Sequence, residues 1–116
     1  MRHDQEHRLQ CACVRWFSLQ YPQLQGLLFA VPNGGARDQV TGARLKAEGV
    51  VAGVADLILL HSNDTYCALA IEMKTPKGRQ SPSQKDWQLR FEGNGGKYVI
   101  CRTLEEFINT IKDYLS

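Results

Sequence analysis

Two carboxylates and one lysine stand at the ends of two apolar runs, where they could bind a metal ion and act on a phosphate ester. Asp56 opens the run ADLILL, and Glu72 and Lys74 close the run YCALAIEMK. Charged groups are rarely buried unless they are paired or bound to a metal. Two neighbouring carboxylates repel each other, and Mg²⁺ relieves that repulsion while it keeps positions for water and phosphate oxygens. Lys74 could position or deprotonate an attacking water, or offset the charge of the transition state.

Each of these residues also has an ordinary structural explanation. Glu72 and Lys74 could form a surface ion pair, which contributes little stability, and Asp56 could be a turn residue at a strand entry. The intervening segment HSNDT carries turn residues and predicts an antiparallel hairpin. The start of one strand then lies beside the end of the other, which gathers the three charges at one edge of the sheet. That joint placement favours a functional site, in which the Met73 backbone carbonyl could be a further ligand.

The elements that must position these residues alternate between helix and strand. Residues 4–20 carry apolar side chains at helical spacing, and Glu6 lies on the same face as that stripe. Ser81 and Gln84 form a capping box with Pro82 at the first helical position. The patterns predict helices at 4–20, 41–48, 81–92 and 103–115, and strands at 27–31, 55–60, 66–74 and 97–101. One α/β domain spanning 1–116, with a central mixed sheet flanked by helices, is the natural packing.

Composition narrows the class of protein. The hydrophobic fraction of 43% can fill a core, and no apolar run approaches the roughly 20 residues that a membrane-spanning helix needs. The polar start MRHDQEHRLQ is unlike a signal peptide, so we expect a soluble, cytoplasmic protein without a membrane partner. The four cysteines form no C-x-x-C pair, which argues against zinc. We expect all four to be small, buried hydrophobic residues.

The motifs together resemble the VRR-NUC branch of the PD-(D/E)xK nuclease superfamily. The resemblance rests on GVADLILL, IEMK and SPSQKDW, on the PNGG loop and on the approach LKAEGVVAGVAD, and it runs from Glu6 to about Gly96. Ala55 stands where the superfamily name has proline. That difference touches only the backbone stiffness before Asp56, so it does not count against catalysis.

The resemblance implies a restriction-endonuclease-like αβββαβ core and Mg²⁺- or Mn²⁺-dependent cleavage of DNA phosphodiesters. By matched position, Asp56 and Glu72 would be metal ligands and Lys74 the catalytic lysine. Glu6 matches the acidic residue of the family's first helix and could join the metal ligands. Gln84 matches the glutamine on the helix after the lysine, although its role in the capping box is an equally good explanation.

Several residues are candidates for contact with DNA. Asn33, Gly34 and Gly35 suit a tight turn, but their backbone amides could also approach a phosphate closely, and the resemblance favours the second explanation. Basic side chains on both sides of the expected site are candidate phosphate contacts. These are Arg37, Arg44, Lys46, Lys77 and Arg79.

We therefore expect a structure-specific DNA endonuclease similar to a Holliday-junction resolvase. A four-way junction is symmetric, and two paired incisions favour a homodimer with twofold symmetry. The last helix offers Phe107, Ile108, Ile111 and Leu115 for an interface, unless they cover the sheet. One alternative is a non-catalytic nucleic-acid-binding module on the same fold. Another is a nucleotide- or small-molecule-binding protein that uses the PNGG loop, but the sequence lacks a G-x-G-x-x-G motif and a P-loop lysine.

Overall fold

The computed structural model of the chain describes residues 2–32 and 39–116. Its elements are α1 (Arg2–Gln20), the short 3-10 helix η1 (Pro22–Leu24), β1 (Leu28–Ala30), α2 (Gln39–Ala47), β2 (Leu57–Leu59), β3 (Leu69–Met73), α3 (Pro82–Gly93), β4 (Lys97–Cys101) and α4 (Leu104–Leu115). The predicted αβββαβ order is confirmed, with α2 inserted between β1 and β2 and α4 added at the end. The strands β1, β2 and β3 are each shorter than predicted at both ends, and β4 has the predicted bounds.

The four strands form one mixed sheet in the order β1-β2-β3-β4. The pairs β1–β2 and β2–β3 are antiparallel, as the HSNDT turn predicts, and β3–β4 is parallel. Leu57 of β2 lies opposite Ile71 of β3. This register places Asp56, which precedes Leu57, beside Glu72, which follows Ile71. The sheet therefore brings together the two carboxylates that the sequence separates by sixteen positions.

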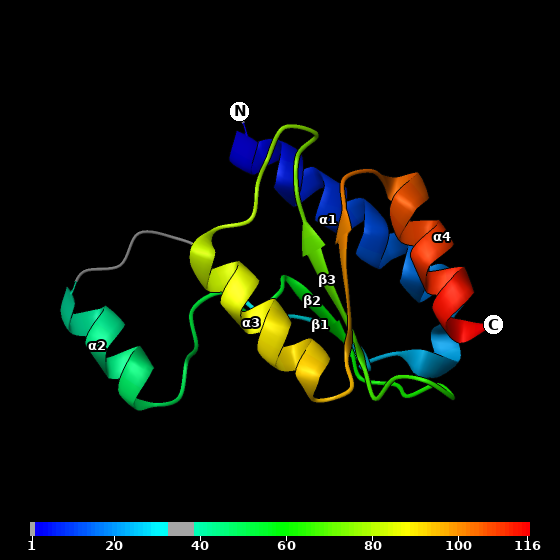
Figure 1. The fold of residues 1–116 in the computed structure, drawn as a ribbon. Helices are drawn as coiled ribbons and strands as arrows, with labels where there is room; N and C mark the ends of the chain where they lie inside the picture. Colours follow the sequence, from blue (N-terminus) through cyan, green and yellow to red (C-terminus); the bar gives the residue numbers. More distant parts are fainter. Residues whose placement is uncertain (1, 33–38) are drawn as a thin grey trace.

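Helices cover the two faces of the sheet in different ways (Figure 1). On one face, α1 and α4 pack against Leu69, Ile71 and Met73 of β3 and form the larger core. On the other face, α3 packs through Trp87 and Phe91 against Ala70 and Tyr98, among others. The alternation of large and small residues along β3 thus assigns its two faces, because successive side chains of a strand point to opposite sides. Glu72 falls on the face with the small residues, under α3.

The apolar residues of α4 are used inside the fold. Phe107 and Ile111 are fully buried in the larger core, so these two cover the sheet and are not available to an interface. In contrast, α2 extends away from the sheet and its covering helices (Figure 1). None of the helices in the described part of the chain is long and apolar enough to span a membrane.

The cysteine prediction is correct for two residues and wrong for the other two. Cys13 and Cys101 are buried, and burial raises the pKa of these thiols to about 12 and about 11. Cys11 and Cys67 are exposed. For Cys11 the reason is the helical period, because two residues of α-helix turn the side chain by about 200° and place it opposite Cys13.

Candidate active site

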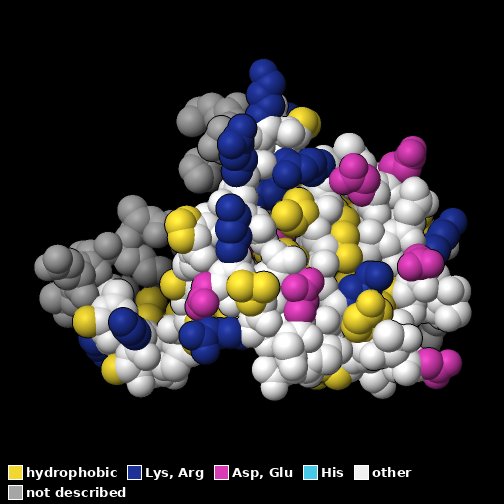
Figure 2. Space-filling view, viewed as in Figure 1, with side chains coloured by type: hydrophobic (Ala, Val, Ile, Leu, Met, Phe, Trp, Pro, Cys, Tyr) yellow, Lys and Arg dark blue, Asp and Glu magenta, His cyan; other side chains and the backbone are white. Residues whose placement is uncertain are grey.

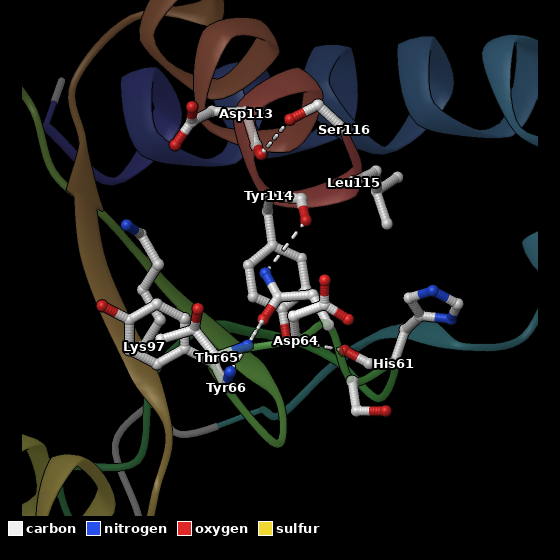
Figure 3. Close-up of a pocket in the computed structure, with 11 residues that line it drawn as sticks. His61, Asp64, Thr65, Tyr66, Lys97, Asp113, Tyr114, Leu115 and Ser116 are labelled. Atoms are coloured by element: carbon white, nitrogen blue, oxygen red, sulfur yellow. Dashed lines mark hydrogen bonds between the residues drawn. The ribbon is translucent and has the colours of Figure 1, made fainter.

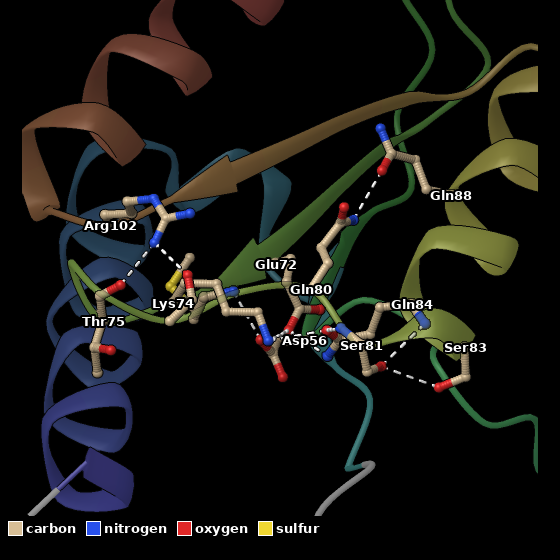
Figure 4. A network of polar contacts seen from close by, with 12 residues as sticks. Asp56, Glu72, Lys74, Thr75, Gln80, Ser81, Ser83, Gln84, Gln88 and Arg102 are labelled. Carbon is tan, nitrogen blue, oxygen red and sulfur yellow. Dashed lines mark hydrogen bonds and ion pairs between the residues drawn. The ribbon is translucent and has the colours of Figure 1, made fainter.

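Asp56, Glu72 and Lys74 meet at one end of the two central strands, where the end of β3 lies beside the start of β2 (Figure 4). An oxygen of Asp56 (Oδ2) accepts a hydrogen bond from the Met73 backbone N–H at 2.7 Å, which fixes this carboxylate against β3. The Lys74 ammonium lies 3.4 Å from Glu72 Oε2. The predicted gathering of these three side chains is therefore what the structure contains, while their roles stay predictions.

Glu72 is the most deeply buried of the three charged side chains. Its side chain is 3% exposed, because β2 and β4 flank it in the sheet and α3 lies above it. Lys74 is also buried, and Asp56 is half-buried. Unpaired charges are rarely found at this depth, since ions lose much solvation energy on leaving water. The surface ion pair considered from the sequence is therefore wrong: this pair lies inside the protein.

Gln84 connects the helix α3 to the charged pair. Its Oε1 accepts hydrogen bonds from the Ser81 backbone N–H and from Lys74 Nζ, both at 2.9 Å, and its Nε2 donates to Glu72 Oε2 at 2.9 Å. The Gln84 backbone N–H in turn donates to Ser81 Oγ at 3.2 Å, which completes the capping box. The capping role of Gln84 is therefore confirmed, and the same side-chain amide contacts both charges, while its part in catalysis stays a prediction.

Glu72 is held in a state that disfavours its charge. Desolvation by burial is the main cause, and the Asp56 carboxylate adds to it, so that the pKa of Glu72 rises to about 8 although Lys74 acts in the opposite direction. Its second oxygen, Oε1, is buried and receives no hydrogen bond from the residues that the structure describes. A buried oxygen without a donor costs free energy. A cation at this position would supply the missing partner and would offset the repulsion between the carboxylates.

The donor set fits a hard divalent cation only in part. Asp56 and Glu72 supply the oxygen ligands that Mg²⁺ and Mn²⁺ prefer, and Mg²⁺ typically takes one or two carboxylates and keeps several waters. Within residues 2–32 and 39–116, no group of three Asp, Glu, His or Cys side chains is close enough to hold an ion. Glu6 lines one cavity with Asp56 but stands outside the carboxylate pair. Its predicted part in the metal site is therefore the least supported.

Comparisons with known proteins agree on one family. The family model of the VRR-NUC domain matches residues 1–104. The chain belongs to the VRR-NUC family. A solved structure described as a VRR_NUC domain protein has the same fold, with a TM-score of 0.82 and 24% sequence identity over 95% of this chain and 87% of that chain. No protein with a curated description matches the chain. VRR-NUC domains are nuclease-type domains, so this chain is a nuclease-type, DNA-binding domain.

The described basic residues that are predicted to contact phosphate lie in two places on this VRR-NUC domain. Lys77 and Arg79 are exposed on the loop between β3 and α3, directly after Lys74. Figure 2 shows Lys and Arg side chains gathered on the side of the molecule that carries this loop and α3. Arg44 and Lys46 are exposed on α2, at a distance from the carboxylates. The predicted contacts at Asn33, Gly34, Gly35 and Arg37 lie outside the described residues.

Arg102 supports the loop that follows Lys74, a role that the sequence analysis missed. Its Nη1 donates to the backbone carbonyls of Thr75 at 2.8 Å and Gly78 at 2.7 Å (Figure 4). Arg102 comes directly after β4, and the parallel pairing of β4 with β3 brings it beside Lys74. Only this pairing reveals the contact, because twenty-four or more residues separate Arg102 from the carbonyls it binds.

Gly53 supports the approach to Asp56, and its role was also missed. It has a φ of +86°, which favours glycine, and a Cβ atom here would overlap the Ser83 carbonyl in the first turn of α3. This close approach packs the segment before Asp56 against the start of the helix that carries Gln84. The positive φ could not be read from the sequence, where Gly53 is one glycine among ten.

Figure 3 shows a second cavity, lined by residues that follow β2, whereas Asp56 precedes β2, so it lies at the opposite end of this strand from the carboxylates. It has a volume of about 480 Å³ and lies between the segment 61–66 and the end of α4. Tyr114 donates a hydrogen bond to the His61 carbonyl at 2.6 Å, and the Asn63 amide donates to the Tyr114 carbonyl at 3.0 Å. These bonds attach the β2–β3 connection to α4. The cavity contains none of the motif residues of the VRR-NUC domain, so we assign it a structural role.

Proposed function

We propose that this domain is a Mg²⁺- or Mn²⁺-dependent endonuclease that hydrolyses DNA phosphodiester bonds. The observation that carries the proposal is the buried Oε1 of Glu72, which has no hydrogen-bond partner among the described residues, beside the Asp56 carboxylate. If Glu72 served only the stability of the fold, a neutral residue would serve as well at this buried position. A metal ligand, in contrast, needs its negative charge. The membership of the VRR-NUC family supports the same conclusion.

Asp56 and Glu72 would hold the cation, with the Met73 backbone carbonyl and Glu6 as further candidate ligands. A bound divalent ion would supply charge neutralisation at the phosphate and acidify a bound water. The protein's own part is to keep both carboxylates in place. The Met73 N–H holds Asp56, and the Gln84 amide holds Glu72.

Lys74 supplies a positive charge at the reacting phosphate. Its ammonium is fixed at 2.9 Å from the Gln84 amide oxygen, a neutral acceptor, and lies farther from the Glu72 carboxylate. The charge is therefore only partly compensated within the protein. It can orient the attacking water and stabilise the negative charge that develops on the phosphoryl oxygens, because electrostatic stabilisation is strongest where water is excluded.

The proposed substrate is branched DNA, with the four-way junction as the leading candidate. A chain of 13.1 kDa with one carboxylate pair contacts only a short length of backbone. Two copies related by a twofold axis would offer two sites to the two matching strands of a junction. We therefore propose a homodimer, with α2 and its exposed Arg44 and Lys46 as the part free to reach additional DNA.

A cleavage panel tests this proposal. Labelled linear, flap, splayed and four-way DNAs are incubated with the protein in Mg²⁺, Mn²⁺ or EDTA, and sedimentation at micromolar concentration gives the oligomeric state. We expect metal-dependent cleavage that is fastest on the junction and absent in EDTA. A monomer that cuts flaps as fast as junctions would remove the resolvase assignment. Tight DNA binding without cleavage in either metal would identify a non-catalytic binding module instead.

A further inference from the structure

A cavity beside the carboxylate pair is not explained by metal binding or by the basic loop. It has a volume of about 530 Å³ and extends from Asp56 along one face of α1. His7, Gln10, Cys11 and Arg15 are among the helix residues that line it. His7, Cys11 and Arg15 are spaced four positions apart, so they form one continuous strip along the helix. The strip begins at the proposed site of chemistry and leads away from it.

The charges on α1 differ in whether they are compensated. Arg8 forms an ion pair with Asp4 at 2.8 Å, so its charge is locally balanced. Arg15 is exposed and makes no hydrogen bond or ion pair with the residues that the structure describes. It lies at the end of the cavity lining that is farthest along α1 from Glu6. A guanidinium without a partner is a ready ligand for phosphate, which it can bind through two N–H groups.

The rest of the lining suits a nucleic acid strand. Gln10 and His7 offer polar groups, Cys11 Sγ lies 3.6 Å from His7 Nε2, and Val14 offers an apolar contact for a sugar or a base. His7 and Arg15 are eight residues apart, which is about 12 Å along a helix. At an axial rise of about 3.4 Å per nucleotide, this length accommodates roughly three to four nucleotides of one strand.

We propose that this cavity is a binding subsite for the DNA strand that enters the active site, with Arg15 contacting a phosphate of that strand. The inference rests on the nuclease function proposed above and extends it, because it assigns a strand path on the α1 side. The basic loop with Lys77 and Arg79 joins the end of β3 to α3. The strip on α1 and this loop would then both contact DNA near the reacting phosphate.

The two exposed cysteines provide a footprinting test in the unaltered protein. Cys11 lines the cavity, whereas Cys67 lies near Gly95 at the opposite end of β3 and serves as the internal control. The protein is treated with N-ethylmaleimide in EDTA, alone or with a saturating synthetic four-way junction, and labelling is followed by peptide mass spectrometry. At DNA concentrations well above Kd, we expect the labelling rate of Cys11 to fall to roughly one tenth of its rate without DNA, or lower, and the rate of Cys67 to stay unchanged. Equal labelling of Cys11 with and without DNA would overturn the proposal.

Arg15→Gln tests the phosphate contact, and Arg8→Gln is the matched control. Both variants lose one arginine from α1, but only Arg15 lines the cavity. Binding of the junction in EDTA is measured by fluorescence anisotropy at several salt concentrations. Arg15→Gln should reduce the slope of log K against log salt by about 0.9, the value for one phosphate contact, and Arg8→Gln should leave it near the wild-type value. Equal slopes in the two variants would refute a contact at Arg15.

The outcomes separate this inference from the nuclease proposal. Protection of Cys11 and a reduced slope for Arg15→Gln, without cleavage in Mn²⁺, would support the strand path and remove the proposed catalysis. Metal-dependent cleavage with an unprotected Cys11 and an unchanged slope would keep the catalysis and overturn the strand path. Circular dichroism shows whether each variant is folded, so that a weaker salt dependence is not caused by unfolding.

Discussion

Replacing Glu72 with glutamine should stabilise the metal-free protein while it abolishes cleavage. Burial and Asp56 raise the pKa of Glu72 to about 8 from its usual 4.5. Because the folded-state pKa is raised, the contribution of Glu72 to stability is fully present below about pH 4.5 and is lost as the pH rises towards about 8. At about 1.4 kcal/mol per pKa unit, the loss at neutral pH has an upper limit of about 3 kcal/mol. Relaxation around the charge reduces it, so we expect about 1–3 kcal/mol.

The glutamine side chain fits the same place without the charge. Its amide oxygen can accept the hydrogen bond from Gln84 Nε2, and its amide N–H₂ can donate towards Asp56, which faces Glu72 as an anion. In EDTA at pH 8, the midpoint of thermal unfolding of Glu72→Gln should exceed that of the wild type by roughly 3–10 °C. Near pH 4 the two midpoints should converge, because the wild-type carboxyl is then protonated in both states.

Thermal unfolding in EDTA from pH 4 to pH 8.5, together with cleavage of the junction in Mn²⁺, gives both results on one preparation. Glu92→Gln is the matched control, because Glu92 is an exposed carboxylate on α3 that accepts one hydrogen bond from Gln88. It should show neither the stabilisation nor the loss of cleavage. A lower midpoint for Glu72→Gln at pH 8, or a pH dependence equal to that of the wild type, would refute the desolvation argument.

Three further changes test other parts of the site. Lys74→Ala should keep Mn²⁺ binding, measured by calorimetry, but lose most cleavage; weakened metal binding that excess Mn²⁺ rescues would leave the lysine a scaffolding role only. Gly53→Ala should cost about 2 kcal/mol or more by denaturant unfolding, since its Cβ would overlap Ser83, whereas Gly49→Ala, with a similar positive φ and open space, should cost only about 1 kcal/mol. Mn²⁺ should raise the unfolding midpoint of the wild type more at pH 8 than at pH 6, because ligands bind metal deprotonated; equal shifts would count against Glu72 as a ligand.

Local patterns were sufficient to predict most of the fold. The turn residues after β2 predicted the antiparallel pairing that joins Asp56 to Glu72. The capping residues gave the start of α3 to the residue. These features depend on neighbours along the chain, which is why a single sequence contains them.

The features that could not be predicted depend on pairing between distant segments. The contact of Arg102 with the loop after Lys74 exists only because β4 lies parallel to β3. The closeness of Gly53 to Ser83 depends on how α3 packs over the sheet. The exposure of Cys11 is a different case, because the helical period of α1 places Cys11 opposite the buried Cys13 and therefore predicts that it is exposed.

The geometry of the charged pair argues against a purely structural role. An ion pair that stabilises a fold brings its charges into direct hydrogen bonding and satisfies the remaining oxygens. Here Lys74 is bonded to the Gln84 amide at 2.9 Å and lies 3.4 Å from Glu72, whose other oxygen has no donor in the part of the chain that the structure describes. The arrangement lowers the stability of the metal-free fold at the position where a cation would bind Glu72 and a phosphate would pair with Lys74. Variants that remove a carboxylate charge here, Glu72→Gln or Asp56→Asn, should therefore gain stability in EDTA and lose cleavage.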